Sequence, residues 1–414
     1  MYNEINNLII FLFIVYIYSP KMSVSTKIFK SMNQSSWIRR MFEDGLVLKE
    51  KFGENNVFDF SLGNPNLEPP SEFYKILRKL ALNPPQGIHR YMPNAGYITT
   101  RNAIANQLSK EINIQFTSDH IIMTCGTGGG LNVIIKTLVD PNDEVLIFSP
   151  YFVEYLFYID NHNAKHKIVP TNQNFLPNIN ALAKSITKKT KMIIINSPNN
   201  PTGVVYSEDV LSSIGKTIQE KEKLFGTQIY LVSDEPYRKI LFDNLRYPHV
   251  FPHHTRTIIT TSHSKDLALA GERIGYIAIN PSIESNKDLS DGLTFSNRIL
   301  GFVNAPALMQ NIISQLQNVS VDILDYQNKR DILYNNLTSI GYSIIKPQGA
   351  FYIFPKSPIK DDILFAEKLR EEKILVVPGS GFGKPGYFRI AYCVDIDIIN
   401  RSLNGFSNVL KRFN

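Results

Sequence analysis

Beginning near residue 120, the sequence alternates short runs rich in β-branched residues with longer stretches of helical character. The runs that we predict to be strands are 120–124, 144–149, 191–196, 228–233, 256–262 and 274–280. Strands that alternate with helices in this way are typical of a parallel sheet covered by helices. We therefore predict an α/β fold, with a large domain that holds a mostly parallel sheet flanked by helices.

The pattern changes after about residue 320. A helical segment is followed by a short strand around 349–355, another helix and a strand around 386–392, which is typical of a separate α+β unit. A chain of 414 residues is long enough for two such units. We predict a large domain over residues 61–322 and a smaller α+β domain built from residues 23–60 and 323–414.

Residues 1–22 form an apolar N-terminal extension. Its apolar run, residues 8–18, is 11 residues long, whereas a helix needs about 20 to span a bilayer. No positively charged leader precedes the run and no small-residue cleavage site follows it before Lys21, so a signal anchor is weakly supported. Met22 opens a polar segment, and translation that starts there would omit the extension. We expect a cytoplasmic protein without membrane association.

Basic residues exceed acidic ones by 44 to 37, for a net charge of +7, but they form no long block. This distribution favours anionic substrates or cofactors over nucleic acid as partners. The two cysteines, Cys125 and Cys393, lack the spacing of a disulfide framework or a zinc site, and a reducing compartment suits them. The pair His253-His254 has no helical partner and no nearby carboxylate, so we predict no metal site.

Four of the predicted strands end in unusual polar or glycine-rich segments. The carboxyl ends of parallel strands meet at one edge of a sheet, where open α/β sheets bind their ligands. We therefore expect one site to contain all four segments, which are residues 125–130, 197–203, 234–237 and 262–265.

Lys265 follows the predicted strand at 256–262, and a lysine at this edge is a candidate for forming an imine with a carbonyl compound. Only the neutral amine attacks a carbonyl, and partial burial near another cation such as Arg273 would lower the lysine pKa enough to supply it. A surface lysine on a loop is the alternative when Lys265 is considered alone. The neighbouring segments decide between these interpretations.

The glycine-rich segment that contains Gly126 and Thr127 opens a predicted helix. Free backbone N–H groups and the helix dipole favour an anion there. No Gly-Lys-Ser/Thr follows, as a P-loop requires, and no acidic residue ends the next strand, as a dinucleotide site requires. We interpret the segment as a site for a single phosphate, completed by Ser262 and Arg273.

Asp234 ends an apolar strand, where an ionised carboxylate is costly to bury without a cationic partner. A helix cap or a solvated turn is the alternative role. A protonated pyridine nitrogen is a suitable partner, while Tyr237 and Asn200 have donors for a phenolate oxygen. Either Tyr151 or Phe152 offers a ring face for stacking.

Phosphate, pyridinium, phenolate and aldehyde are the groups of pyridoxal 5'-phosphate, and the chain has a suitable residue for each. The sequence resembles the class I and II aminotransferases, the fold-type I family of pyridoxal phosphate enzymes. The resemblance spans about residues 30–410, in the family's order. Its motifs are Ser61-Leu62-Gly63-Asn64-Pro65, Tyr91-Met92-Pro93-Asn94-Ala95-Gly96, Asn199-Asn200-Pro201-Thr202-Gly203, Asp234-Glu235-Pro236-Tyr237, Ser264-Lys265 with Arg273-Ile274-Gly275, and Phe388-Arg389-Ile390.

The resemblance implies a role for each residue around the cofactor ring. Lys265 would form the imine with the cofactor, and Asp234 would pair with the pyridine nitrogen. Tyr237 and Asn200 would bind the ring oxygen, while Phe152 matches the stacking aromatic. By the same resemblance, residues 61–322 would be the cofactor-binding domain.

Phosphate and substrate positions also follow from the resemblance. The implied phosphate ligands within one chain are Gly126, Thr127, Ser262 and Arg273. Tyr91 would complete this group from the neighbouring subunit, which implies a homodimer with shared active sites. Arg389 is similar to the arginine that binds the substrate α-carboxylate, helped by Asn200 and the Gly63 backbone.

The implied activity is ping-pong transamination between an L-amino acid and a 2-oxo acid, of the aspartate or alanine type. Carbon–sulfur lyases and aminocyclopropane carboxylate synthases share the cofactor chemistry and are the alternative. Transcription regulators with an aminotransferase-like domain carry a helix-turn-helix domain before it. The roughly 40 residues between Met22 and the first motif are too few for such a domain.

The sequence constrains the identity of the substrate side chain less than it constrains the reaction. Some aspartate-using relatives bind the distal carboxylate through a lysine in the glycine-rich loop, and the matching position here is Gly128. Arg298 lies within one residue of the place where another branch presents an arginine of the partner subunit, which would suit a dicarboxylate. An ordinary surface position is an equally good interpretation of Arg298.

Overall fold

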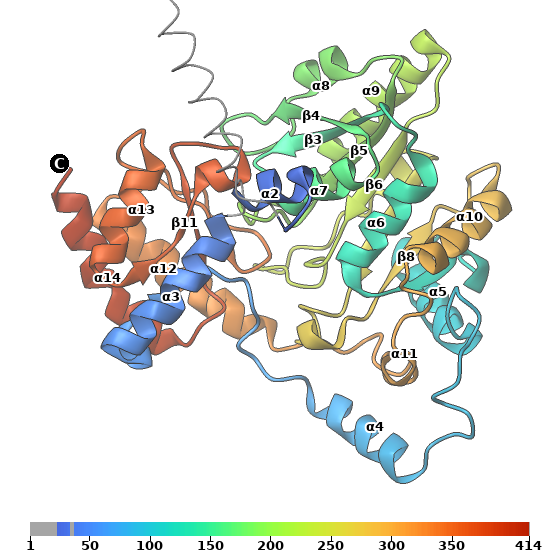
Figure 1. The fold of residues 1–414 in the computed structure, drawn as a ribbon, viewed down its shortest axis with the longest axis horizontal. Coiled ribbons are helices and arrows are strands. Elements are labelled where there is room, and N and C mark those ends of the chain that lie inside the picture. The colour runs from blue at the N-terminus through green and yellow to red at the C-terminus, as the bar shows by residue number, and fades with distance from the viewer. Residues whose placement is uncertain (1–22, 34–36, 414) are drawn as a thin grey trace, which may run out of the picture.

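The computed structural model describes residues 23–33 and 37–413, drawn in Figure 1. Its largest sheet has seven strands in the order β2-β8-β7-β6-β5-β3-β4. The strands are β2 (Ile121–Thr124), β3 (Glu144–Ser149), β4 (Lys165–Pro170), β5 (Thr190–Asn196), β6 (Tyr230–Asp234), β7 (Thr257–Ser262) and β8 (Gly275–Ile279). Strands β3 to β7 pair in parallel, whereas β8 is antiparallel to both of its neighbours, β2 and β7. The predicted α/β fold with a mostly parallel sheet is confirmed.

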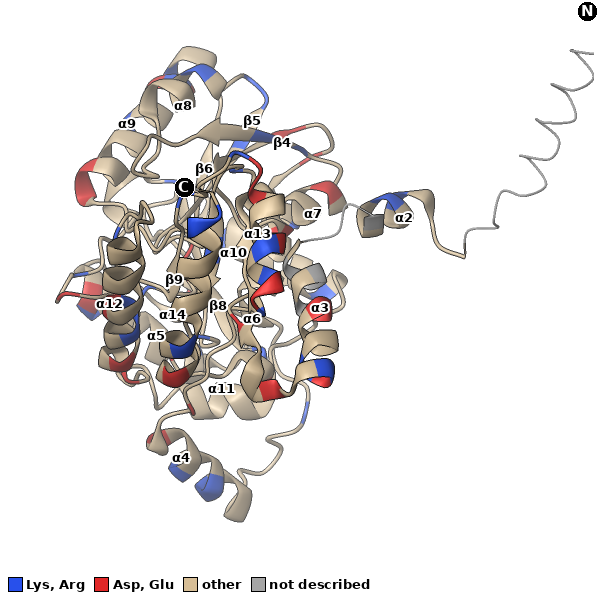
Figure 2. Ribbon diagram, turned by 90° about the vertical axis from the view of Figure 1, so that its left-hand side faces the viewer, with Lys and Arg blue, Asp and Glu red and all other residues tan. Residues whose placement is uncertain are grey.

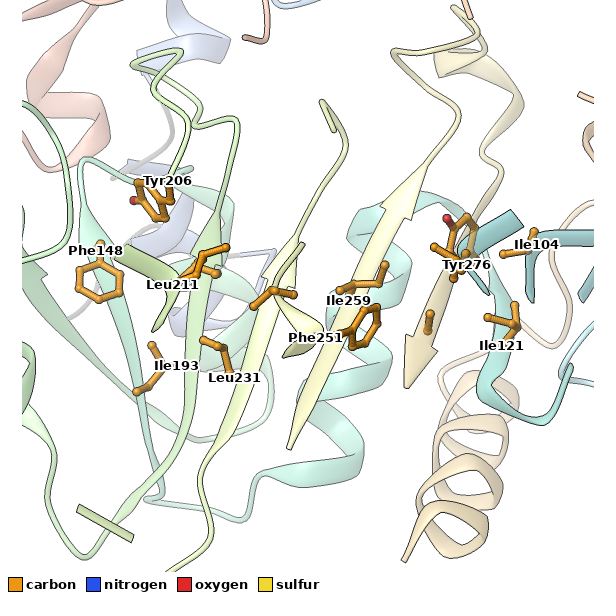
Figure 3. Packing of buried hydrophobic residues seen from close by; sticks show 14 of the residues in the cluster. Ile104, Ile121, Phe148, Ile193, Tyr206, Leu211, Leu231, Phe251, Ile259 and Tyr276 are labelled. Carbon is orange, nitrogen blue, oxygen red and sulfur yellow. The ribbon is translucent and has the colours of Figure 1, made fainter. Parts of the chain in front are cut away.

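Alternate residues of each strand face opposite sides of this sheet and pack against different helices. On one face, Ile193 and Leu231 belong to a core with Leu211 of a covering helix, as Figure 3 shows. On the other face, Ile194 and Val232 belong to a second core. Among the helices that contribute to these cores are α5 (Ile98–Ile112), α8 (Ile179–Ser185), α9 (Glu208–Phe225) and α11 (Ala307–Ile313) on the first face, and α6 (Gly126–Leu138), α7 (Glu154–Asn161) and α10 (Asn286–Ile299) on the second.

A second group of elements comes mainly from the C-terminal part of the chain. It comprises β9 (Tyr352–Ile353), β10 (Ile374–Leu375), β11 (Val377–Pro378), β12 (Phe388–Ala391), α12 (Ile323–Ile340), α13 (Asp362–Glu371) and α14 (Ile396–Lys411). An antiparallel sheet of order β11-β12-β9 packs with these helices around a separate hydrophobic cluster. The early strand β1 (Phe58–Asp59) pairs in parallel with β10. This pairing supports our proposal that residues 23–60 join 323–414 in a smaller domain beside residues 61–322.

Three N-terminal helices lie at different places around these two groups. Helix α3 (Trp37–Phe52) lies beside α13 and β11, as the blue and red ribbons of Figure 1 show. Helix α2 (Thr26–Asn33) contacts α7 instead, through a 2.7 Å ion pair between Lys27 and Asp160. Helix α4 (Ser71–Leu82) lies at the periphery of the molecule.

The structure changes some details of the predicted elements. The sequence pattern does not predict β4, because this edge strand begins Lys165-His166-Lys167 and exposes most of its residues, so it lacks an apolar run. The strand expected around 349–355 is confined to β9, and the segment before it forms turns. These differences leave the edge that carries the polar segments unchanged.

The predicted apolar extension, residues 1–22, lies outside the described part of the chain. Among the helices within residues 23–33 and 37–413, none combines the length and the apolar character needed to cross a membrane. No group of three or more potential metal ligands occurs within the same ranges. Figure 2 shows basic and acidic residues interspersed along outer helices such as α3 and α12.

Candidate active site

A cavity of about 300 Å³ opens where β5, β6 and β7 end. Each of the four polar segments expected to meet at this edge contributes to its lining. Ten of the predicted site residues line it: Gly63, Thr127, Phe152, Asn200, Asp234, Tyr237, Ser262, Lys265, Arg273 and Arg389. The convergence expected from topology alone is therefore present in the structure.

Lys265 lies three residues beyond β7, and its amine points into the cavity. The Nζ atom donates a hydrogen bond to the carbonyl oxygen of Gly63 at 2.6 Å. Burial lowers the pKa of Lys265 to about 8, and the nearby cations Arg389 and Arg273 lower it as well. Roughly a tenth of this amine is neutral at pH 7, far more than for an ordinary lysine, and the neutral amine is the form that attacks carbonyl carbon.

Asp234 is the last residue of β6 and is fully buried. Its Oδ2 atom accepts a short hydrogen bond from the Tyr155 hydroxyl, whereas Oδ1 is buried with no hydrogen-bond partner among the described residues. Burial raises the pKa of this carboxyl to about 7. An unpaired buried oxygen is costly, so Oδ1 is suited to a cationic N–H donor brought by a ligand.

The first turn of α6 lies at the end of the cavity where we predict a phosphate. Gly126 has φ +71°, and a Cβ at this position would lie 2.7 Å from Nη2 of Arg273, so the close approach of the guanidinium requires glycine. Thr127 has a buried Oγ1 without a partner among the described residues. Arg273 donates through Nη1 to the carbonyl of Ala270 at 2.9 Å, while Thr127 and Ser262, at the end of β7, line the cavity beside it, so the group of donors is suited to a phosphate.

Tyr237 and Phe152 border the middle of the cavity. The hydroxyl of Tyr237 lies 2.7 Å from that of Tyr352, and both side chains are buried. Phe152 lines the cavity and meets Tyr155 edge-on, with ring centres 5.7 Å apart. Tyr151, the alternative stacking residue, is buried and absent from the cavity lining. The structure therefore favours Phe152 as the ring that faces a ligand.

Arg389 enters the cavity from β12, the strand of the smaller group. Its Nη1 donates to Oδ1 of Asn200 at 3.0 Å, and its guanidinium lies between the rings of Tyr352 and Phe382, 4.6 and 4.8 Å from their centres. The buried Nε has no partner among the described residues. A desolvated guanidinium with a free donor is a typical site for a carboxylate.

Two predicted residues lie away from the cavity. Tyr91 is 91% exposed, and Arg298 lies on the outer side of α10 with its guanidinium 5.2 Å from the ring centre of Phe295. Neither belongs to the cavity lining of this chain. Any contact of Tyr91 or Arg298 with a ligand would have to be made in a neighbouring subunit.

Three tyrosines of the site are absent from the sequence-based prediction. Tyr155 and Tyr158 lie one and two turns into the segment after Phe152, and Tyr352 follows Phe351 in β9. In one sequence these residues look like ordinary aromatic core positions. The fold brings Tyr158 and Tyr352 to the cavity lining and places the Tyr155 hydroxyl against Asp234. The spacing of Tyr155 and Tyr158 within helix α7 is the one signal of this in the sequence.

Comparison with known proteins agrees with this site. The family model described as aminotransferase class I and II matches residues 55–404. The chain is 34% identical to a probable aspartate aminotransferase of Methanocaldococcus jannaschii, over 84% of this chain and 92% of that protein. It is 32% identical to an aspartate/prephenate aminotransferase of Thermus thermophilus, over 84% of this chain and 90% of that protein.

Solved structures give the same result. An amino transferase of Eubacterium rectale aligns with a TM-score of 0.92 and 36% identity, over 95% of this chain and all of that chain. The aspartate aminotransferase of Thermus thermophilus with maleate aligns with a TM-score of 0.81 and 26% identity, over 94% of this chain and all of that chain. The chain therefore belongs to the class I and II aminotransferases, transaminases of a family that uses pyridoxal phosphate.

Proposed function

We propose that this protein is a pyridoxal phosphate-dependent aminotransferase of the aspartate type, which moves the amino group of an L-amino acid to a 2-oxo acid. The observation that carries the proposal is one cavity that holds the Lys265 amine, the unpaired Oδ1 of Asp234 and the free donor of Arg389. The names of the relatives from Methanocaldococcus jannaschii and Thermus thermophilus support aspartate as a substrate.

The residues present fit pyridoxal phosphate. The unpaired oxygen of Asp234 suits a protonated pyridine nitrogen, and Tyr237 with Asn200 suits the ring oxygen. Phe152 would cover the ring face. Gly126, Thr127, Ser262 and Arg273 would hold the phosphate. When bound, the cofactor supplies an electron sink for the charge left on Cα after a proton is removed.

The chain itself supplies substrate binding and proton transfer. Arg389 binds the α-carboxylate of the substrate, with Asn200 and the Gly63 backbone beside it, so the Cα–H bond is held in one orientation. The neutral Nζ of Lys265 accepts the Cα proton and would deliver it to the cofactor carbon rather than back to Cα. Asp234, kept in place by Tyr155, would pair with the ring nitrogen.

A screen of amino donors against 2-oxoglutarate, oxaloacetate and pyruvate tests the proposed function. We expect the highest kcat/KM for aspartate or glutamate and no release of 2-oxo acid beyond one equivalent per site without an acceptor. Continuous release without an acceptor would contradict transamination and indicate an elimination reaction of the carbon–sulfur lyase kind.

We also propose a homodimer in which Tyr91 reaches the phosphate of the neighbouring subunit. Its 91% exposure in the single chain supports this assignment, because the side chain is free to reach a neighbouring subunit. Mixing a Tyr91→Ala chain with a Lys265→Ala chain should restore activity that neither has alone. An active monomer in sedimentation velocity would contradict the dimer. The proposed location is the cytoplasm, which cell fractionation can check.

Loading of the cofactor onto cofactor-free protein is expected to depend on pH. Because burial lowers the pKa of Lys265 to about 8, the neutral amine increases as pH rises toward 8 and then levels off. The rate constant of loading should rise roughly tenfold per pH unit below this value and flatten above it. Stopped-flow absorbance after mixing with pyridoxal phosphate measures it. A profile that continues to rise steeply to pH 10 would mean that the lysine has an ordinary pKa.

Tyr155→Phe is expected to weaken cofactor binding because Oδ2 of Asp234 loses its short hydrogen bond and keeps a long one, 3.5 Å from Nδ2 of Asn196. A hydrogen bond to a charged group contributes about 1.5–3 kcal/mol, so we expect an affinity lower by about 10- to 100-fold. Equilibrium dialysis of pyridoxal phosphate measures the change. Tyr206→Phe, which removes another fully buried hydroxyl outside the cavity, is the matched control and should leave the affinity unchanged.

A further inference from the structure

Tyr352 lies at the junction of three other residues of the site and is only 2% exposed. Its hydroxyl is 2.7 Å from that of Tyr237, and the Cζ atom of Arg389 lies 4.6 Å from its ring centre. A Cβ on Gly63 would lie 1.9 Å from the Tyr352 hydroxyl, so glycine at this position leaves the space that the hydroxyl occupies. The position of the Tyr352 side chain is therefore fixed from three directions.

Either hydroxyl could be the donor in the Tyr237–Tyr352 hydrogen bond, and the surrounding charges decide between them. The guanidinium of Arg389 faces the Tyr352 ring and stabilises negative charge on it. Burial raises the pKa of Tyr352 to about 12, while Arg389 lowers it. Burial holds the pKa of Tyr237 well above 10, Tyr352 and Asp234 raise it further, and Arg389 lowers it as it does for Tyr352. The Arg389 guanidinium lies against the Tyr352 ring and the more acidic phenol is the better donor, which favours Tyr352 as the donor and Tyr237 as the acceptor.

This direction determines where the Tyr237 proton points. With the Tyr352 proton between the two oxygens, the Tyr237 O–H is directed elsewhere, and within the described residues its hydroxyl has no other hydrogen-bond partner. Tyr237 lines the cavity, so its proton is available to an acceptor there. A hydroxyl that accepts a hydrogen bond also becomes a stronger donor.

We propose that Tyr352 is a positioning residue that donates to Tyr237 and thereby directs the Tyr237 O–H at the ring oxygen of pyridoxal phosphate. The inference rests on the proposed function, because it requires that ring oxygen in the cavity. Tyr352 acts only through Tyr237 in this role and touches no reacting atom.

The test compares two ligands in a Lys265→Ala background, where binding is noncovalent. The ligands are pyridoxal phosphate and 3-deoxypyridoxal phosphate, the analogue without the ring hydroxyl, measured by isothermal titration. Tyr352→Phe should weaken binding of pyridoxal phosphate by roughly 5- to 10-fold and leave binding of the analogue within about twofold. Tyr237→Phe should give the same selective loss.

Tyr392→Phe is the matched control, since its buried hydroxyl donates to the carbonyl of Ala350 at 3.3 Å and has no contact with Tyr237. It should leave the affinity for both ligands unchanged. An equal loss for both ligands in Tyr352→Phe, or no loss for either, would overturn the inference. Failure of the Lys265→Ala protein itself to bind pyridoxal phosphate would instead refute the proposed function.

A second readout uses the protein with Lys265 intact. A weaker donor at the ring oxygen leaves more negative charge on that oxygen. This charge stabilises the proton on the nearby nitrogen through which Lys265 is joined to the cofactor. The pH midpoint of the absorbance change of the bound cofactor should therefore rise in Tyr352→Phe, and an unchanged midpoint would overturn the inference. Thermal unfolding of the cofactor-free variant establishes that it is folded.

Discussion

Lys265→Ala is expected to lower kcat for transamination on the order of 10⁴-fold, because the variant loses both its attacking amine and its proton carrier. Noncovalent binding of pyridoxal phosphate should survive, since the groups at the first turn of α6 and at Asp234 are untouched. Absorbance spectra should show free aldehyde in place of the lysine-bound form. Steady-state assays with aspartate and 2-oxoglutarate give the rate.

Two controls accompany this experiment. Lys346→Ala removes a half-exposed lysine that pairs with Asp331 outside the cavity, and its activity should equal that of the unaltered protein. Borohydride reduction followed by peptide mass spectrometry should place the cofactor on Lys265. A tag on another lysine, or appreciable activity of Lys265→Ala, would contradict the assignment.

Asp234→Asn is expected to have the second-largest effect. Removing one member of a buried ion pair costs about 3–5 kcal/mol, so cofactor affinity and kcat should each fall by roughly 10²- to 10³-fold. The amide keeps the size of the carboxyl group but cannot neutralise a pyridinium. Asp362→Asn is the control, because that carboxylate is equally buried and binds Ser380 away from the cavity. A similar loss in both variants would indicate a general effect of buried carboxylates.

The same substitution should change how stability depends on pH. Burial raises the pKa of Asp234 to about 7, from 3.8 in the unfolded chain. Between these values the folded cofactor-free protein holds a proton that the unfolded chain has released, so this group lowers stability as pH rises from about 4 to 7. Urea denaturation should show a flatter dependence in Asp234→Asn. Glu235, with its pKa also raised to about 7, contributes equally in both proteins.

The sheet could be predicted because strands buried on both faces are continuous apolar runs. Ile193, Ile194 and Ile195 are an example, since alternate members enter opposite cores. Strand β4 could not be predicted, because an exposed edge strand with charged residues has no apolar pattern. The antiparallel direction of β8 is also absent from local sequence, since strand direction is set by the connection and not by composition.

The meeting of polar residues at one edge of the sheet could also be predicted. The carboxyl ends of parallel strands lie at the same edge, which brings Asp234, Lys265 and Asn200 together. Tyr155 and Tyr352 could not be predicted from spacing, since their roles depend on hydrogen bonds between elements far apart in the sequence. Tyr91 is predicted from its motif alone. We propose that it acts in a neighbouring subunit, and its 91% exposure in the single chain is compatible with that role.

The close approach of Tyr158 to Gly128 has a consequence for engineering substrate preference. A Cβ at position 128 would lie 3.0 Å from the Tyr158 hydroxyl, so the two positions share one space beside the first turn of α6. A larger residue at position 128 requires the Tyr158 hydroxyl to shift, so the two positions constrain each other. Diversifying both positions together is the way to introduce a new charged contact there, with the cofactor contacts left intact.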